Sequence, residues 1–145
     1  HRMIPHARCA MHVHSIHATV LASLADSRLP AIDQNSAMFF DRIAIDDHYG
    51  GMALGDEAAR CVATLADPRV RTLVMGNHGV LVIGETVAEA WNRLYYFERA
   101  AETYVRALQT GRPLRIMSEA VAEKTAREWE DYPSTVTCPP VVPRS

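Results

Sequence analysis

The chain has few of the features that mark membrane, secreted or nucleic-acid-binding proteins. No apolar run approaches the roughly 20 residues that a membrane-spanning helix needs. The first residues, HRMIPHARC, lack the apolar segment of a secretory signal. The formal net charge is −2 and no basic stripe is visible. Neither a membrane nor a nucleic acid is therefore an expected partner.

Cysteine is also scarce. The 145 residues contain three, Cys9, Cys61 and Cys138, which are widely separated and form no CxxC motif. An odd, scattered set fits reduced thiols better than a disulfide framework, so we expect a cytoplasmic protein. Cys9 and Cys61 lie in apolar surroundings and are predicted to be core residues. No methionine stands at position 1, and we expect that further residues precede it.

Hydrophobic spacing predicts helices and strands in a mixed order. We expect strands over residues 8–14, 42–45, 70–75 and 80–84, and helices over residues 16–26, 55–66, 86–111 and 118–130. This order indicates an α/β layered domain over residues 1–132. The proline-rich residues 133–145 are predicted to form an extended or disordered tail.

Capping residues support two of these helices. Ser15 stands directly before the helix at 16–26, as a predicted N-cap. Thr86 and Glu89 have the T-x-x-E spacing of a capping box, and Gly111 follows the same helix at its other end. The long helix over residues 86–111 is therefore the element with the clearest boundaries.

Three histidines stand where two of the predicted strands end. His12 and His14 are two positions apart on a strand, so they project from the same face with Cβ atoms roughly 6–7 Å apart. Two imidazoles at that separation can bind one metal ion, and a catalytic site commonly takes three protein ligands. His78, in the GNHG link between two apolar strands, is the best third ligand, because Gly76 and Gly79 permit close approach there.

The spacing alone leaves an ordinary structural role open. A histidine on a strand is more often a hydrogen-bonded residue than a metal ligand. The HxH pattern also occurs by chance and in zinc hydrolases of the barrel type, and GNHG has the composition of a simple hairpin turn. A metal site and a set of unrelated histidines are both compatible with these residues.

Two longer stretches carry a resemblance to a known family. HVHSIHATVLASL resembles the HTHS-x-x-A-T-A-L-A segment of the class II aldolase/adducin family. LVMGNHGVLVIGETVAEAWNRLYYFERAAE resembles that family's LL-x-NHG-x-x-x-x-G-x-T-x-x-E-A segment, which leads into a long helix with an L-E-x-x-A pattern. The two stretches occur in the expected order and span most of residues 8–109.

The resemblance implies a fold, an assembly and a metal. The fold is a three-layer α/β/α domain with a central mixed or antiparallel sheet, assigned here to residues 1–132, and the usual assembly is a homotetramer. By position, His12, His14 and His78 match the ligands of a divalent metal, with zinc as the first choice and manganese, iron or cobalt as alternatives. The family's acid/base glutamate stands upstream of the HxH strand. No residue here matches it, so the catalytic residue of this chain is unknown. We expect that glutamate upstream of His1, and therefore an N-terminally incomplete domain.

The implied function is that of a metal-dependent lyase. A divalent ion held by neutral imidazoles acts as a Lewis acid on a substrate carbonyl and stabilises an enediolate. An aldolase- or decarboxylase-type reaction on a small hydroxylated or oxo-acid substrate passes through such a species. Ser15, Asn77 and Gly79 are candidate substrate-binding residues. The alternative is an adducin-like domain that serves assembly or binding without catalysis.

Five polar residues also have plainer explanations. We expect His17 at the surface of the helix that follows Ser15, and His48 in a solvated turn. Glu98 and Arg99 are predicted to be a packed or solvated pair in the long helix. Asn77 fits either contact with a substrate or the shaping of its turn.

Overall fold

The computed structural model describes residues 3–51 and 57–132. Within these ranges the elements, in chain order, are β1 (Cys9–Val13), α1 (Ile16–Ala22), α2 (Gln34–Ala37), β2 (Ile43–Asp46), α3 (Glu57–Thr64), β3 (Thr72–Met75), β4 (Gly79–Gly84), α4 (Val87–Gln109) and α5 (Glu119–Asp131). The predicted tail at 133–145, with Cys138, lies outside the described residues. So do residues 55 and 56 of the helix predicted over 55–66.

The four strands form one sheet in the order β1-β4-β3-β2. β3 and β4 pair antiparallel as a hairpin across the GNHG link, and β1 pairs antiparallel with the other side of β4. β2 runs parallel to β3, which requires the crossover that carries α3. The sheet is therefore mixed, as the family resemblance implies.

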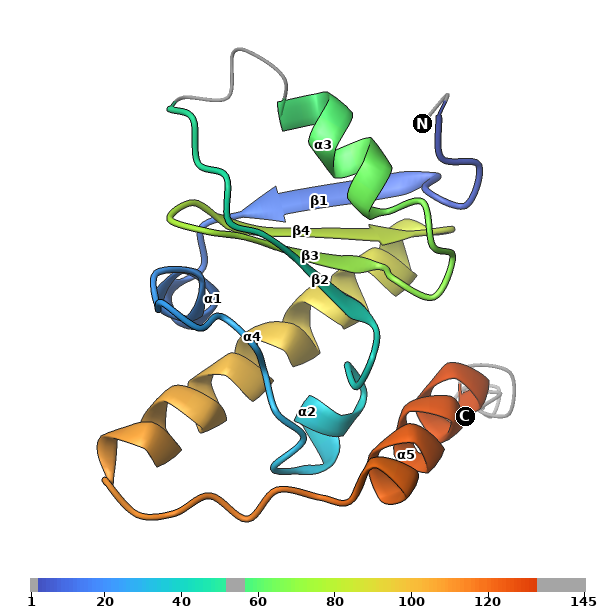
Figure 1. The fold of residues 1–145 in the computed structure, drawn as a ribbon. Helices are drawn as coiled ribbons and strands as arrows, with labels where there is room; N and C mark the ends of the chain where they lie inside the picture. The colour runs from blue at the N-terminus through green and yellow to red at the C-terminus, as the bar shows by residue number, and fades with distance from the viewer. Residues whose placement is uncertain (1–2, 52–56, 133–145) are drawn as a thin grey trace, which may run out of the picture.

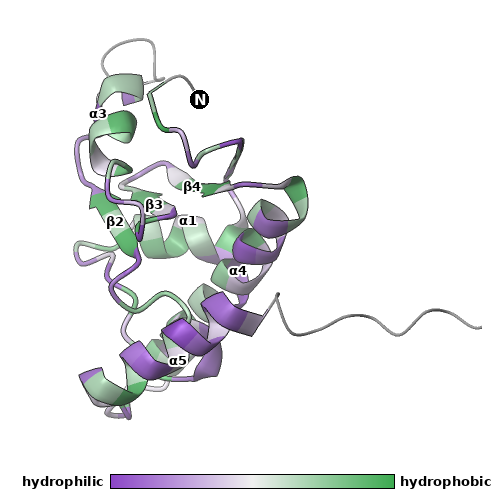
Figure 2. Cartoon of the chain, turned by 90° about the vertical axis from the view of Figure 1, so that its right-hand side faces the viewer, coloured by the Kyte–Doolittle hydropathy of each residue, from purple (hydrophilic) through white to green (hydrophobic). Residues whose placement is uncertain are grey.

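Helices cover the two faces of the sheet unequally (Figure 1). α1 and the long α4 pack on one face, and α3 lies on the other. This arrangement gives the α/β layers expected from the sequence. Figure 2 shows green, hydrophobic strands β2 and β3 and a predominantly purple α5 at the periphery.

The face under α1 and α4 holds the larger core, which we call the first core. Its fully buried members include Phe39, Phe97, Val74, Val80 and Val82. The rings of Phe39 and Phe97 meet edge to face at 5.3 Å between centroids, a favoured aromatic geometry. The strand side chains that point to this face alternate with side chains that point to the other one.

A second, smaller core lies under α3. It contains Ile4, Ala7, Leu65, Leu73, Met75 and Ile83. No residue of α3 itself is fully buried. Cys61 of α3 packs against this core and Cys9 of β1 against the first one. Both thiols are free and half-buried, so they lie at the edges of the cores rather than inside them.

α5 is fastened to the rest of the domain by a buried arginine. The side chain of Arg42 is 5% exposed, and its Nε lies 2.9 Å from Glu130 Oε1. Its Nη1 lies 2.5 Å from Glu123 Oε2. Both carboxylates belong to α5, and Trp129 of the same helix packs against Tyr96 of α4. Two ion pairs and one aromatic contact therefore hold α5 in place.

Two of the element boundaries that differ from the prediction have local explanations. The first helix ends at Ala22, four residues before the predicted end, because the Ser23 hydroxyl donates to the Thr19 carbonyl and the chain turns there. The strand predicted from residue 70 begins at Thr72, since the Val70 N–H donates to the Asp67 carbonyl in a turn.

The capping box is only half formed. Thr86 Oγ1 accepts from the Glu89 N–H as predicted, but the Glu89 carboxylate accepts from the N–H of Glu85 rather than that of Thr86. At the other end, Gly111 adopts a φ of +66°, which glycine tolerates and which closes α4.

No helix among the described residues combines the length and apolarity needed to cross a lipid bilayer.

Candidate metal centre

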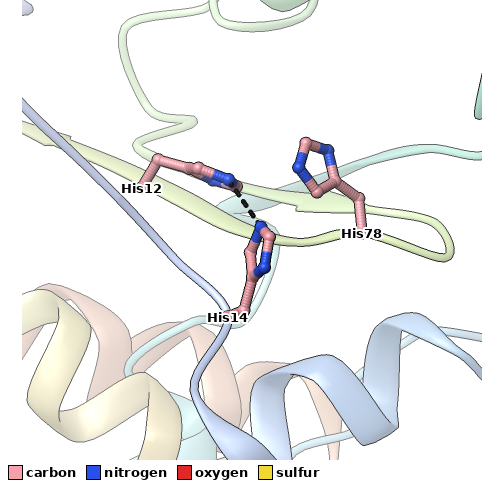
Figure 3. Close-up of side chains that lie close together, drawn as sticks. All are labelled: His12, His14 and His78. Atoms are coloured by element: carbon pink, nitrogen blue, oxygen red, sulfur yellow. Dashed lines mark hydrogen bonds between the residues drawn. The ribbon is translucent and has the colours of Figure 1, made fainter. Parts of the chain in front are cut away.

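The three predicted histidines meet on the face of the sheet that carries α3. The Nε2 atoms of His12 and His14 are 3.0 Å apart. The His78 ring centroid lies 4.7 Å from that of His12 and 4.8 Å from that of His14. One nitrogen from each ring falls within 4.8 Å of the others, and Figure 3 shows the three rings turned toward a common space.

Strand register brings these residues together. β1 and β4 are antiparallel, with His12 opposite Leu81 and Val13 opposite Val80. The C-terminal end of β1 therefore lies beside the N-terminal end of β4, where the hairpin link presents His78. β1 points Met11 and Val13 into the first core, so His12 and His14 project from the other face.

Gly79 makes the close approach possible. A Cβ at this position would stand 2.5 Å from the Val13 carbonyl oxygen and 2.9 Å from Cδ2 of His14. No side chain fits there without moving the strand or the ring. This geometry gives Gly79 a structural reason to be glycine, whether or not it touches a substrate.

Asn77 shapes the turn before His78. It has a φ of +57°, in the left-handed region that asparagine tolerates better than most residues. Its N–H donates to the Ala22 carbonyl at 2.8 Å, which ties the hairpin to α1, and its side chain is exposed.

His12 is prepared to act as a ligand. Its Nδ1 lies 3.1 Å from the Val80 carbonyl oxygen. A carbonyl only accepts, so Nδ1 carries the proton and Nε2 keeps its lone pair. Partial burial of its ring lowers the pKa of His12, and the neighbouring His78 and His14 lower it further against the opposing effect of the Val80 hydrogen bond. The neutral imidazole that a metal requires is therefore the favoured state.

The donor set fits a divalent metal ion. Nitrogen ligands at 2.0–2.1 Å from a tetrahedral ion stand about 3.4 Å from one another. The spacing here runs from 3.0 Å to at most 4.8 Å, so small ring rotations suffice. His12 and His14 are exposed to solvent, which leaves an open side of the kind that catalytic sites keep for water or substrate.

Two residues beside His78 were not predicted from the sequence. Glu57, the first residue of α3, places Oε1 3.1 Å from Nδ1 of His78, and both side chains are 18% exposed. The ring of Tyr49 stands 6.0 Å from the His78 ring. Glu57 stands 21 positions before His78 with no motif between them, so only the fold brings it to the site.

Glu98 has a different role from the one predicted. It makes no pair with Arg99 but reaches from α4 to the start of α1. There its carboxylate accepts from the Ser15 hydroxyl at 2.7 Å and from the N–H groups of His17 and Ala18, each at 2.9 Å. Ser15 occupies the N-cap position, but its side chain caps nothing. The cap of α1 is thus supplied by another helix.

The hydrogen bonds to Glu98 stabilise its ionised form. Burial would raise the pKa of this carboxyl, but the donors on Ser15, His17 and Ala18 outweigh burial and lower the pKa below its ordinary value. A charged carboxylate therefore fixes the junction between β1 and α1, one residue beyond His14.

Two other histidines, His17 and His48, stand apart from the trio. His17 was predicted at the surface, but its ring is 25% exposed and its Nδ1 lies 2.9 Å from Glu98 Oε1. His48 is 83% exposed in the turn after β2, in agreement with the prediction of a solvated loop.

Comparisons with known proteins identify the chain's relatives. Residues 1–105 match the family model described as the Class II Aldolase and Adducin N-terminal domain. The chain is 32% identical over 104 residues to human gamma-adducin, covering 72% of this chain and 14% of that protein. It is 26% identical over 140 residues to the decarboxylase NovR of Streptomyces niveus, covering 91% and 50%.

A solved structure shares the fold. An aldolase II superfamily protein from Pseudomonas syringae superposes with a TM-score of 0.79 at 27% sequence identity, covering 90% of this chain and 51% of that one. The chain spans half or less of the length of the curated relatives it matches. The match over residues 1–105, together with the shared fold, shows that this chain belongs to the class II aldolase and adducin family.

Proposed function

We propose that the chain carries the metal centre of a divalent-metal-dependent lyase. The observation that supports this most directly is the meeting of His12, His14 and His78, with the lone pair of His12 Nε2 directed into their shared space. A divalent ion bound there supplies Lewis acidity to a substrate carbonyl and so favours an enediolate. The substrate class is a small hydroxylated or oxo-acid molecule, and the reaction is of the aldolase or decarboxylase type.

The chain's own residues have defined tasks in this proposal. The three histidines hold the ion, and Gly79 keeps the hairpin close enough to β1 for His78 to join the other two. Glu98 fixes the β1–α1 junction. Ser15, Asn77 and Gly79 remain candidate substrate contacts. No described residue is assigned as the acid/base group.

Metal binding gives the direct test. Metal-free full chain is titrated with Co²⁺, whose visible absorption reports tetrahedral nitrogen ligation. We expect one ion per chain, and a loss of at least about 100-fold in affinity for His78→Ala, because two imidazoles form an incomplete site. His48→Ala, a change of an exposed histidine outside the trio, is the matched control and should bind like the wild type. A wild-type chain that binds no stoichiometric ion would refute the proposal.

An adducin-like, non-catalytic domain is the second candidate. The 32% identity to gamma-adducin supports it. Exchange of a carbon-bound proton separates the two. An enzyme that forms an enediolate exchanges the hydrogen next to the carbonyl of a suitable hydroxyketone with D₂O, which NMR detects. A protein that binds metal but promotes no exchange across a panel of hydroxyketones and oxo-acids favours the adducin-like role.

The finer parts of the proposal are zinc as the metal, a homotetramer and a cytoplasmic location. Three imidazoles plus open positions suit zinc, and the free Cys9 and Cys61 fit a reducing compartment. Val87, Trp91 and Tyr95 form an exposed apolar stripe along α4, which supports subunit contact. Metal analysis of protein purified without added metal, and sedimentation of the same sample, test the first two points.

A further inference from the structure

Two of the three histidines have their Nδ1 atoms engaged by acceptors of different kinds. His12 Nδ1 faces the backbone carbonyl of Val80 at 3.1 Å. His78 Nδ1 faces the carboxylate of Glu57, also at 3.1 Å. Figure 3 shows His78 presenting one ring nitrogen toward His12 and His14 and the other away from them. The engaged nitrogen is therefore distinct from the one that could meet a metal.

We infer that Glu57 is the positioning residue for His78, holding its Nδ1–H so that Nε2 presents a lone pair to the metal. The inference rests on the proposed function and names a residue that neither motif contains. Glu57 accepts a hydrogen bond from Nδ1 of His78, as the Val80 carbonyl does from Nδ1 of His12. One acceptor is part of the sheet, and the other is a side chain from α3.

The chemistry of the pair requires this assignment. An ionised carboxylate only accepts hydrogen bonds, so a bond at 3.1 Å demands a proton on Nδ1 of His78. In a neutral imidazole the other nitrogen is then unprotonated. Without an acceptor, the ring samples both tautomers and other rotations, and the part of the population with a proton on Nε2 cannot bind the metal through that nitrogen.

The surroundings shield this hydrogen bond from solvent. Both side chains are 18% exposed, so solvent and salt screen them less than they screen an open pair. Glu57 lies in the first turn of α3, where the helix dipole favours a negative charge. The helix that covers the open face of the sheet thereby also orients one ligand of the site.

The test combines a tautomer measurement with a metal titration. Long-range ¹H–¹⁵N NMR of the metal-free full chain reports which nitrogen of His78 carries the proton. Zn²⁺ affinity is then measured by competition with a chelating dye for the wild type, Glu57→Ala and Glu57→Gln. Glu128→Gln, at a 65% exposed site on α5, is the matched control.

We expect the Nδ1–H tautomer of His78 in the wild type and a mixture of tautomers in Glu57→Ala. Zn²⁺ affinity should fall about 10- to 100-fold in Glu57→Ala, the range seen when such partners are removed. Glu57→Gln keeps an amide oxygen as an acceptor, so it should restore the tautomer and recover part of the affinity. Glu128→Gln should match the wild type.

The outcomes separate this inference from the proposed function. A wild-type His78 that carries its proton on Nε2, or unchanged affinity in a folded Glu57→Ala, overturns the role of Glu57 while the metal site stands. Failure of the wild type to bind any ion overturns the proposed function, and the tautomer measurement still decides the Glu57–His78 contact. If Glu57→Ala does not fold, the wild-type tautomer and the affinity of Glu57→Gln decide the matter.

Discussion

The two faces of the sheet are built for different purposes. Under α1 and α4, Val74, Val80, Val82 and Phe97 are fully buried. Under α3 the cover is thinner, because α3 buries none of its own residues completely. The three histidines stand on this second face. Dense packing on one side of a strand thus fixes the backbone, while the other side leaves polar groups accessible to a ligand.

The largest expected effect comes from the densely packed face. Phe97→Ala removes a fully buried ring from the first core and should lower the free energy of unfolding by about 3–5 kcal/mol. Val62→Ala on α3, at a half-buried position of the other face, should cost only about 1 kcal/mol. Urea unfolding followed by circular dichroism measures both. Equal costs at the two positions would contradict the difference between the faces.

The next largest effect is expected at Gly79, where the hairpin and β1 approach each other closely. Gly79→Ala places a Cβ 2.5 Å from the Val13 carbonyl oxygen and 2.9 Å from the His14 ring. We expect a loss of about 1–3 kcal/mol from overpacking, together with weaker Co²⁺ binding because His14 must move. The companion is Gly50→Ala, which has nothing within 4 Å of the added Cβ and should change neither quantity. If Gly79→Ala folds and binds Co²⁺ like the wild type, the close approach does not control the site.

A smaller effect is expected at the carboxylate that joins α4 to α1. Glu98→Gln replaces an acceptor of four hydrogen bonds with a group that accepts through one oxygen only. The free energy of unfolding should fall by about 1–2 kcal/mol, as for the loss of a helix cap. Glu102→Gln, one turn further along α4, removes only an i,i+4 pair with Arg106 and should stay within about 0.5 kcal/mol of the wild type.

A double-mutant cycle shows whether Glu98 acts through Ser15. The Ser15 hydroxyl and the carboxylate are 2.7 Å apart, so the effects of Ser15→Ala and Glu98→Gln should not add. Strict additivity would mean that the N–H groups of His17 and Ala18, and not the hydroxyl, account for the stabilisation.

The part of the site that can be predicted from the sequence depends on residues that are close together in the chain. Alternation along β1 places His12 and His14 on one face, and the glycines and asparagine around His78 favour a hairpin turn. The apolar run after that link identifies the partner strand. Local patterns are therefore enough to predict the strands and to nominate the histidines.

The two supporting carboxylates could not be found in that way. Glu98 meets Ser15 across 83 positions and Glu57 meets His78 across 21, and neither spacing has a local signature. The end of α1 was misplaced for a local reason, because the Ser23 side chain competes for a helix carbonyl. Contacts between elements depend on how the helices cross the sheet, which hydrophobic spacing alone does not specify.

The smallest expected effect concerns α5, which lies away from both faces. Hydrogen bonds from Arg42, and then from Arg127, lower the pKa of Glu123 from its ordinary 4.5 to about 2. A carboxyl with a lowered pKa stabilises the folded state when ionised, so its contribution is complete above pH 4.5 and is lost as the pH falls toward 2. In a Trp91→Phe background, Trp129 should report this loss through a red-shifted emission as its contact with Tyr96 opens.

Glu123→Gln tests the contact between α5 and Arg42 at neutral pH. It should loosen α5 without acid and remove most of the fluorescence transition between pH 4.5 and 2, because the carboxyl that titrates is gone. Co²⁺ affinity at neutral pH should not change, since the contacts of α5 are with α2, Arg42 and Tyr96 rather than with the histidines. Weaker Co²⁺ binding by Glu123→Gln would mean that the position of α5 affects the metal site on the other face of the sheet. The two faces would then be less independent than their packing indicates.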